Sequence, residues 1–372
     1  MTPSCRLALL ITAHSGYAML CHAQIVAVDT TPFSTSRALC ITPDGSIAGG
    51  TFDVGSVATP FRWTQAGGAT PLPMLASWNG AFVTATSSSG DRMLGNRTTS
   101  GSPSPRAVRW INAGTNPVAQ ELGLPASADP NARSDAMDMD ASGVISVGRV
   151  FINAGQSYAA VRWDNQTATF LSTTSSPSEA IAISNSGAKI VGWEGSVVSR
   201  PTLWDNNTRQ FLPMGPVWDT GVATAISGDG NVIAGSVFDI GTNVRQLAFW
   251  STPLSEPVTI GSGDLGANIE GMSLDGSIAV GIRPSGAEGF VWSQATGLLT
   301  PSAYFLTRGV DTSEWTNLQV YGVSDDGTRF VGVGLLAGDN RGFVLTVPSP
   351  ASFVLVVGAL GQFARRRVRL AQ

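Results

Sequence analysis

Short runs of β-branched and apolar residues recur along most of this 372-residue chain, with glycine-rich turns between them. Residues 223–260 show the pattern: four strands are predicted at 223–226, 232–234, 247–250 and 257–260. Short runs bounded by turn residues are typical of β-strands. Asp229 and Gly230 separate the first two runs, and this pair favours a tight hairpin because glycine accepts a positive φ. Long Ala/Leu/Glu/Lys stretches are absent from the sequence, so the pattern indicates an all-β protein.

Seven copies of this unit follow one another at intervals of 43 to 53 residues. The copies share a loose core, Ala-x-x-(Ile/Met/Val)-(Ser/Thr)-x-(Asp/Ser)-Gly, and a second glycine five residues later. Internal repeats of this length indicate a repeat architecture. Only the two glycines occur in every copy; the pairs are Gly45 and Gly50, Gly90 and Gly95, Gly143 and Gly148, Gly187 and Gly192, Gly230 and Gly235, Gly276 and Gly281, and Gly327 and Gly332.

A large apolar side chain follows the second glycine of each copy by 11 to 15 residues. Six copies have tryptophan there, and we expect these side chains to pack between repeats because aromatic residues bury a large area. The seven residues are Trp63, Trp110, Trp163, Trp204, Trp250, Trp292 and, in the last copy, Leu345.

Four short antiparallel strands every 40 to 50 residues predict a seven-bladed β-propeller of four-stranded blades. The alternatives are a β-solenoid, whose coils repeat at shorter periods, and an open sandwich. The seventh copy ends near Thr346 with only three strands, whereas residues 24–29 read as a strand that belongs to no copy. We therefore expect the N-terminal strand to complete the last blade and remove an exposed sheet edge.

The repeat unit resembles the HAF family of probable extracellular repeats over roughly residues 36–347. The segment with Tyr304, Phe305, Gly309 and Trp315 resembles the usual last repeat of such proteins. This resemblance implies a fold and an extracellular location, and it implies no reaction.

Both ends of the chain resemble targeting segments. Residues 1–23 have the order of a secretory signal: Arg6, an apolar run at 7–11, and a small-residue cleavage site before Gln24. Residues 348–372 resemble a PEP-CTERM sorting tail, and the resemblance implies processing by an exosortase-type enzyme after signal peptidase has acted. The tail contains an apolar stretch at 351–364, expected to form a short helix, and an Arg cluster that favours the cytoplasmic side. Its motif residues are Val347, Pro348, Ser349 and Pro350, followed by Arg365, Arg366 and Arg367; Ser349 stands where Glu is usual.

Charge and residue usage exclude several classes of chemistry. Residues 24–347 contain 26 acidic residues against 16 arginines and one lysine, a net charge of −9, which argues against a nucleic-acid partner. The two histidines, His14 and His22, lie in the signal, so the body lacks the base for Ser-His-Asp or Cys-His catalysis and for His-ligated metals. Cys40 is the one cysteine of the body and reads as a small buried residue. We predict no catalytic triad, cofactor or metal site.

A calcium loop is a tempting alternative at residues 138–143, where Asp138, Asp140 and Gly143 match the opening positions of an EF-hand. Position 12 of that loop requires Glu, and Arg149 stands there. A hairpin turn explains the segment better.

Aromatic residues outside the repeat position are the candidate binding residues. Trp78, Trp218 and Trp315, with Phe33 in the first copy, each precede their turn glycine by twelve residues. One hypothesis exposes them on the ring face opposite the tight turns, where they would stack on sugar rings or a protein partner; the other places them in gaps between blades. Trp193 is the one further tryptophan.

The favoured function is a non-enzymatic binding or structural module, displayed on the cell surface or in the matrix. Its expected ligand is extracellular polysaccharide or a surface protein. The alternative is a carboxylate-based glycoside hydrolase or lyase acting on such polysaccharide.

Overall fold

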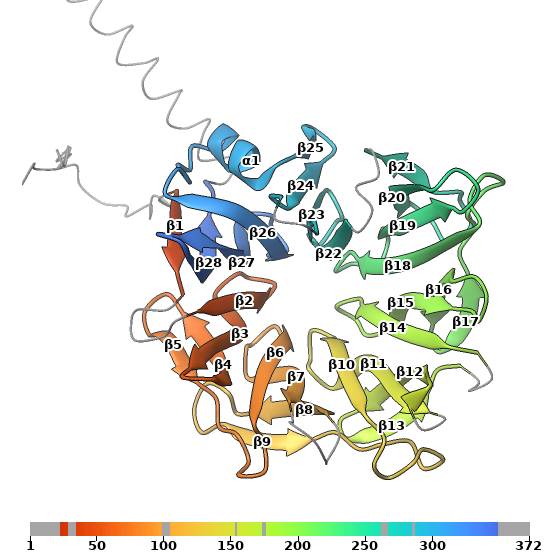
Figure 1. Cartoon of the computed structure of the whole chain (residues 1–372), viewed down its shortest axis with the longest axis horizontal. Coiled ribbons are helices and arrows are strands. Elements are labelled where there is room, and N and C mark those ends of the chain that lie inside the picture. Colours follow the sequence, from red (N-terminus) through yellow and green to blue (C-terminus); the bar gives the residue numbers. More distant parts are fainter. Residues whose placement is uncertain are drawn as a thin grey trace, which may run out of the picture. The chain divides into compact units, whose positions relative to one another are not determined.

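The computed structural model describes residues 23–28, 35–98, 105–152, 155–172, 176–261, 267–284 and 287–348. Within these ranges the strands form seven four-stranded antiparallel sheets that are arranged around a centre as a β-propeller (Figure 1). Residues Ala23–Val347 make up one compact unit. The predicted fold is confirmed, while the expected helix at 351–364 lies outside the described residues.

Each blade runs from an innermost first strand to an outer fourth strand. Blade 1 contains β2 (Ser36–Ile41), β3 (Ile47–Val54), β4 (Val57–Thr64) and β5 (Gly68–Pro71). Blade 2 contains β6 (Gly80–Thr86), β7 (Arg92–Thr98), β8 (Arg106–Ile111) and β9 (Val118–Glu121). Blade 3 contains β10 (Ser134–Met139), β11 (Ile145–Ile152), β12 (Ser157–Asp164) and β13 (Thr167–Phe170). Blade 4 contains β14 (Ser178–Ile183), β15 (Lys189–Glu194), β16 (Arg200–Asp205) and β17 (Thr208–Phe211).

The remaining blades follow the same order. Blade 5 contains β18 (Thr220–Ile226), β19 (Ile233–Asp239), β20 (Val244–Trp250) and β21 (Val258–Ile260), so the four strands predicted for this copy are confirmed. Blade 6 contains β22 (Asn268–Met272), β23 (Ile278–Ile282), β24 (Phe290–Ser293) and β25 (Gly297–Leu299). Blade 7 contains β26 (Trp315–Val323), β27 (Arg329–Leu336), β28 (Asp339–Thr346) and β1 (Gln24–Ala27).

The last blade combines the two ends of the described chain, as the strand count requires. β1 pairs antiparallel with β28, and the register places Gln24 opposite Thr346 and Ala27 opposite Phe343. This pairing supplies the blade's fourth strand and covers the edge that β28 would otherwise present.

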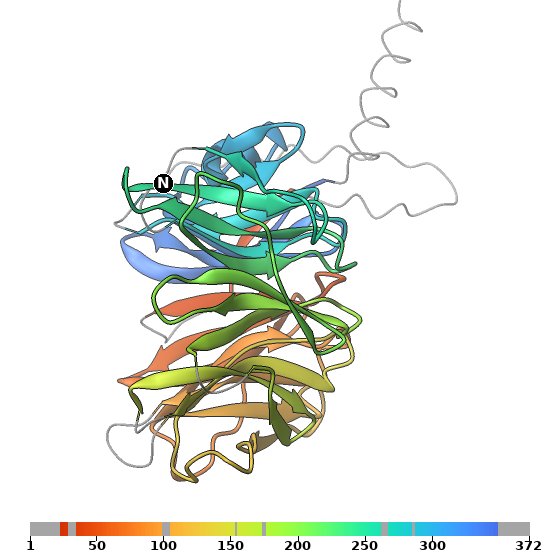
Figure 2. The same ribbon diagram turned by 90° about the vertical axis from the view of Figure 1, so that its right-hand side faces the viewer.

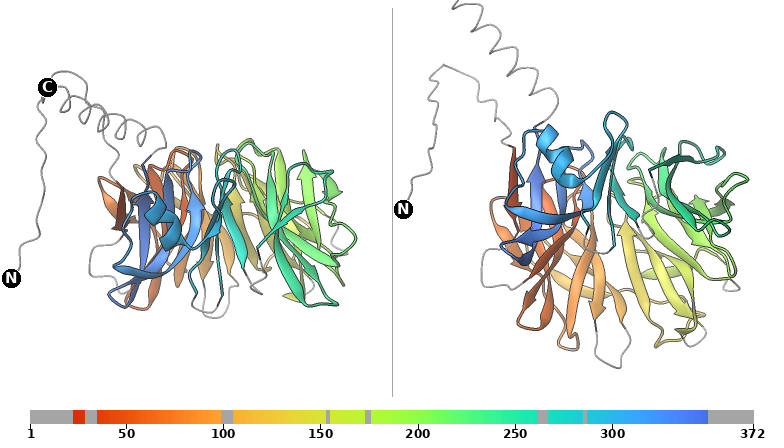
Figure 3. Two further views of the ribbon diagram at one scale, coloured as in Figure 1. Left: turned by 90° about the horizontal axis from the view of Figure 1, so that it is seen from above. Right: turned by 45° about the horizontal axis from the view of Figure 1, so that its top comes forward.

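The strands run across the thickness of the ring, so their connections gather on two faces (Figures 2 and 3). The tight turns between first and second strands lie on one face, here called the turn face. The connections between second and third strands and the entries into each first strand lie on the opposite face, here called the loop face.

The two glycines of each repeat have different structural tasks. The first glycine sits in the tight turn with φ between 62° and 75° in all seven copies, which confirms the hairpin prediction. The second glycine lies on the second strand beside a β-bulge in the first strand. At Gly235, an added Cβ would lie 2.8 Å from the Cα of Ala223 and nearer still to the carbonyl oxygen of Val222. The same backbone carbonyl crowds the second glycine of every blade, so the bulge excludes any side chain there.

Each bulge leaves one residue of the first strand unmatched in the ladder. These residues stand at one equivalent position around the ring, and all of them line a central cavity. In blade order they are Leu39, Thr84, Met137, Ile181, Thr224, Glu270 and Tyr321.

The repeated tryptophans join neighbouring blades, as expected. Trp110, Trp163, Trp204 and Trp250 are fully buried. The indole N–H of Trp163 donates to the carbonyl oxygen of Gly123, which follows the fourth strand of the preceding blade, at 2.7 Å. Equivalent bonds from the other three indoles cross the preceding seams. Trp292 is half-buried against Phe249, with ring centroids 4.5 Å apart.

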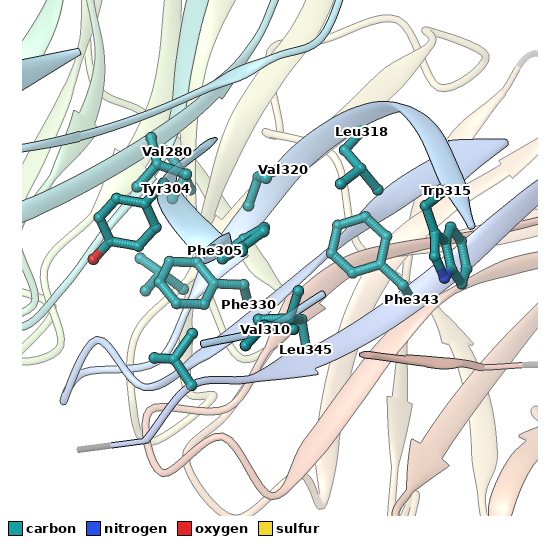
Figure 4. Close-up of a cluster of buried hydrophobic side chains, with 13 residues drawn as sticks. Val280, Tyr304, Phe305, Val310, Trp315, Leu318, Val320, Phe330, Phe343 and Leu345 are labelled. Atoms are coloured by element: carbon teal, nitrogen blue, oxygen red, sulfur yellow. The ribbon is translucent and has the colours of Figure 1, made fainter. Parts of the chain in front are cut away.

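A short helix, α1 (Pro301–Thr307), lies between blades 6 and 7 and was not anticipated from the sequence. The Thr300 side chain caps it by accepting from the Ala303 amide, and Pro301 occupies its first turn. Tyr304 and Phe305 of this helix are fully buried and meet Phe330 at centroid distances of 5.9 and 5.0 Å (Figure 4). The segment that resembles a terminal repeat thus contributes buried aromatic side chains between blades 6 and 7.

Candidate binding site

The four aromatic residues proposed from the sequence do not form an exposed platform. Trp78 and Trp315 are each only 6% exposed. The Trp78 ring packs edge-on against Trp110 at 6.2 Å, and the Trp315 ring packs against Phe343 at 5.7 Å. The hypothesis that exposes these aromatic residues is therefore wrong for Trp78 and Trp315, and the alternative that places them in gaps between blades is confirmed for both. An indole at the entry to a first strand reaches the seam between blades, where burial of its apolar area outweighs contact with water.

The other two proposed residues are placed differently. Trp218 is half-buried and, like Met214, packs against the hydrophobic cluster that includes Leu212. Phe33 lies outside the described residues. No four-membered aromatic site can therefore be assembled from this register position.

A different cluster of aromatic and charged side chains forms on the loop face between blades 3 and 4. We call it the Arg149 cluster. Cross-strand pairing brings its members together, because Arg149 lies opposite Asp135 and Phe151 lies opposite Tyr158. Blade 4 contributes two residues that also face each other. The cluster consists of Arg133, Asp135, Arg149, Phe151, Tyr158, Glu179 and Trp193.

Arg149 is the centre of this cluster. Its guanidinium contacts Asp135 (Nε to Oδ2, 3.0 Å) and Glu179 (Nη1 to Oε1, 3.1 Å), so it joins the two blades. Its Cζ atom lies 4.8 Å from the ring centroid of Tyr158 and 5.3 Å from that of Phe151. These distances are in the range of cation–π attraction.

Trp193 and Arg133 complete the cluster at its two ends. The Trp193 indole N–H donates to Glu179 Oε2 at 3.2 Å, and its ring stands perpendicular to the Tyr158 ring at 5.7 Å. Arg133 donates twice to Asp135, at 3.0 Å each, and covers the Phe151 ring at 4.6 Å. The indole, phenol and phenyl rings are thereby held at fixed angles.

The electrostatics of the cluster are balanced, since two arginines face two carboxylates. Burial raises the pKa of Glu179, although Arg149 and the Trp193 N–H favour its ionised form. Burial opposes the charge on Arg149, but the carboxylates of Glu179 and Asp135 together raise its pKa above the ordinary value. The cluster therefore presents donors and acceptors without a strong net charge.

Exposure separates the parts of the cluster that support it from the parts that can touch a ligand. Asp135 and Glu179 are buried, whereas Phe151, Tyr158 and Trp193 are half-buried. The Arg133 side chain is 44% exposed. Rigid aromatic surfaces beside directed hydrogen-bonding groups can hold the apolar face and the hydroxyls of a sugar ring.

The sequence contained one signal for this cluster, a tryptophan outside the repeat register. The sequence gives Trp193 no partner, because the members of the cluster span sixty positions, from Arg133 to Trp193, and come together only when blades 3 and 4 pack.

A cavity of about 350 Å³ lies at the centre of the ring, lined by residues from all seven blades. Cys40, the free cysteine of the described residues, is half-buried on its wall. Burial raises the pKa of this thiol far above its usual range, so it remains protonated and unreactive.

The segment that resembled a calcium loop is a strand end and a hairpin turn. Asp138 accepts hydrogen bonds from the amides of Met139 and Ile183, and Asp140 accepts from Ser142 and the Ile145 amide. Gly143 has the positive φ of the turn. Among the described residues, no group of three or more His, Cys, Asp or Glu side chains is placed to hold a metal ion.

Comparison with known proteins adds support for the fold. No protein-family model and no curated protein matches the chain. An oligogalacturonate lyase from Vibrio parahaemolyticus has a similar structure: the TM-score is 0.62 at 10% identity, covering 88% of this chain and 94% of that chain. An oligogalacturonate lyase in complex with manganese is similar with a TM-score of 0.60 at 12% identity, and the match covers 89% of this chain and 94% of that chain. The β-propeller domain of the Trilobed protease from Pyrococcus furiosus is similar with a TM-score of 0.54 at 9% identity, and the match covers 84% of this chain and 96% of that chain. These likenesses show the fold alone.

No helix in the described ranges is both long enough and apolar enough to cross a membrane.

Proposed function

We propose that this chain is an exported propeller that acts as a non-enzymatic binding module for extracellular polysaccharide, with the Arg149 cluster as its sugar-binding surface. The observation that carries the proposal is the set of three half-buried aromatic rings fixed around paired arginine and carboxylate groups. Sugar rings have apolar C–H faces that pack on aromatic surfaces, and their hydroxyls accept and donate hydrogen bonds.

The balanced charge of the cluster favours a neutral or weakly charged polysaccharide. Arg149 is already engaged by two carboxylates, so a strongly anionic chain would have to displace them. Arg133 remains the accessible donor, since its side chain is the most exposed charged group of the cluster.

The location of the protein is part of the same proposal. The signal at 1–23 and the tail at 348–372, with its motif at Val347, Pro348, Ser349 and Pro350 and its Arg365–Arg367 cluster, would deliver the propeller to the cell surface or matrix after signal peptidase and an exosortase-type enzyme have processed it. Cell fractionation of the full chain, compared with a chain in which the three arginines are replaced by Ser, tests this step. Unchanged surface display of the variant would contradict it.

Binding is tested with the full chain, a panel of neutral and acidic polysaccharides, and calorimetry. Trp193→Ala and Tyr158→Ala are each expected to weaken binding at least about tenfold, since stacking of one ring is worth on the order of 1.4 kcal/mol. Trp218→Ala removes a half-buried indole from blade 5 and serves as the matched control. Loss of binding in Trp218→Ala, with the two cluster variants unaffected, would move the site to blade 5 and overturn the assignment.

A carboxylate-based hydrolase or lyase is the second candidate, and the Arg149 cluster contains the observation that favours it. Glu179 has a raised pKa, as a general acid requires, and Asp135 provides a second carboxylate on the other side of Arg149. Two of the proteins with a similar fold are oligogalacturonate lyases. The same polysaccharide panel is therefore assayed for new reducing ends and unsaturated products. Turnover that Glu179→Gln abolishes would establish the enzyme and exclude the binding module.

A further inference from the structure

The central cavity has a chemical character of its own, separate from the loop-face cluster. Three carboxylates line it, those of Asp138, Glu270 and Asp325, and among the described residues that form its wall there is no Arg, Lys or His. A cavity lined by one sign of charge and by apolar groups concentrates ions of the opposite sign. The composition of the wall therefore favours a positively charged ligand over an anion.

The three carboxylates differ in how far they are already satisfied. Asp138 accepts two backbone N–H groups, and Asp325 accepts from the Asn185 side chain. Glu270 differs, because no hydrogen bond or ion pair connects its carboxylate to another of the described residues. Glu270 is exposed to solvent inside the cavity, and desolvation by the surrounding protein raises its pKa to about 7. A carboxylate that faces a cavity and has no protein partner is free to pair with a cation.

Glu270 has an aromatic neighbour at the equivalent position of the next blade. Both Glu270 and Tyr321 are bulged residues of first strands, and the Glu270 charge contributes to a raised pKa of Tyr321, after burial. The bulged residues of the other first strands are apolar or hydrogen-bonded to the protein. The Thr224 hydroxyl donates to the Ile269 carbonyl, and Leu39, Met137 and Ile181 line the wall. One side of the cavity thus holds a carboxylate and an aromatic ring, and the others are mostly apolar.

The cavity narrows on the turn face. In six blades a turn residue donates its amide to the turn of the next blade, in bonds of 2.8 to 3.1 Å that run from Ser88 round to Pro43; the donor is the first turn residue except in blade 5, where it is Asp229. The hydrogen bond from Pro43 to the turn that contains Ser88 cannot form, because proline has no N–H. The Asn185 side chain also reaches Asp325, three blades further round the ring, at 3.1 Å. This bond crosses the opening, so a ligand enters from the loop face.

We propose that the central cavity binds a small organic cation, a primary or quaternary ammonium compound with an apolar body. Its charge would lie between the Glu270 carboxylate and the Tyr321 ring, which attracts a cation by its face. Its apolar part would lie against Leu39, Met137 and Ile181. A volume of about 350 Å³ suits a small molecule and excludes a polysaccharide chain. A metal ion fits less well because the described residues offer no cluster of three ligating side chains.

The test uses the full-length chain and three probes in calorimetry: benzylammonium, tetramethylammonium, and benzyl alcohol as the neutral analogue. We expect both cations to bind, benzyl alcohol to bind at least tenfold more weakly, and Ca²⁺ not to compete. Equal binding of benzyl alcohol would show a merely apolar pocket and overturn the proposal. Displacement of benzylammonium by Ca²⁺ would overturn it in favour of a metal site.

Variants locate the site. Glu270→Gln is expected to reduce benzylammonium affinity at least tenfold, whereas Glu256→Gln, which neutralises an exposed carboxylate at the blade 5 rim, leaves it unchanged. Tyr321→Phe keeps the ring and is expected to bind, while Tyr321→Ala loses affinity. Equal losses in the Glu270 and Glu256 variants would show that only the overall negative charge matters. Unfolding curves confirm that each variant is folded.

The pH profile gives an independent readout. Affinity for benzylammonium is expected to rise between pH 6 and pH 8 as Glu270 ionises. Asp138 and Asp325 share the cavity with it, Tyr321 adjoins it, and Arg37 on β2 acts on Tyr321. Asp138, whose pKa is raised to about 6, adds negative charge earlier in the titration. A flat profile in the wild type, or an identical profile in Glu270→Gln, would contradict the assignment to Glu270.

Discussion

Substitution of the second glycine of a repeat tests the reason for its presence in all seven copies. At Gly235 in blade 5, a Cβ would lie 2.8 Å from the Cα of Ala223, whereas ordinary contacts of a Cβ begin near 3.4 Å. The neighbouring strand must therefore move by at least about 0.6 Å, and more at the Val222 carbonyl. The atoms in the way are backbone, so a change of rotamer cannot relieve the overlap.

The expected cost of Gly235→Ala follows from that overlap. Overpacking of a buried site costs about 1–3 kcal/mol, and each ladder hydrogen bond weakened between β18 and β19 adds about 1 kcal/mol. We expect Gly235→Ala to lower the free energy of unfolding by about 3 kcal/mol or more, which lowers the melting temperature by roughly 6 °C or more at about 2 °C per kcal/mol.

Gly230, the first glycine of the same blade, is the matched control. Its φ is 75°, but the nearest atom to an added Cβ is 3.2 Å away, on a side chain. Gly230→Ala should cost about 1–2 kcal/mol through the left-handed backbone alone, and Gly230→Asn less, since Asn206 already adopts such a φ in this protein. Thermal and urea unfolding of the three variants measure which substitution lowers the free energy of unfolding most. If Gly235→Ala is no worse than Gly230→Ala, crowding at the bulge is not the reason for the second glycine.

Three further results are expected. Trp163→Ala should lower the free energy of unfolding by about 3–5 kcal/mol, and Trp163→Phe by less, because it loses mainly the 2.7 Å bond to Gly123; equal losses in urea unfolding would show that packing counts for little at this seam. A chain starting at residue 29 should melt lower and associate more than one starting at residue 23, because it exposes the edge of β28; light scattering that shows no difference would argue against strand closure. Burial raises the pKa of Glu270 to about 7, so the folded state holds its proton over a range where the unfolded chain has lost it. The stability contributed by this group should therefore fall as the pH rises from about 4 to 7, and Glu270→Gln should melt higher than the wild type at pH 8 but not at pH 4; the opposite order would contradict the raised pKa of Glu270.

The blade number, the turns and the ring closure could be derived from the sequence because they depend on local chemistry. A glycine in each tight turn reflects a positive φ that belongs to the turn itself. Counting strands in the seventh copy was enough to assign 24–29 to the last blade, since an unpaired edge has a predictable cost. The repeated tryptophans were readable as seam residues because each copy places one at the same distance from its second glycine.

The binding surfaces could not be derived in this way. Trp78 and Trp315 shared a register with Trp218, yet two are buried and one is half-buried, because the depth of each seam is decided by the neighbouring blade. The Arg149 cluster depends on packing of blades 3 and 4, and its residues follow no repeat.

What the sequence alone determined about this protein is the architecture: seven glycine pairs, each required by the backbone, specify seven hairpins and therefore a ring. What only the tertiary structure decided is which side chains that ring presents. The second glycine marks a bulge, but the bulge turns one residue of the opposite strand toward the centre, and the pairing register selects that residue. Glu270 and Tyr321 became neighbours on the wall of one cavity only when the ring closed. Contacts between distant segments set burial and electrostatics, and no local pattern contains them.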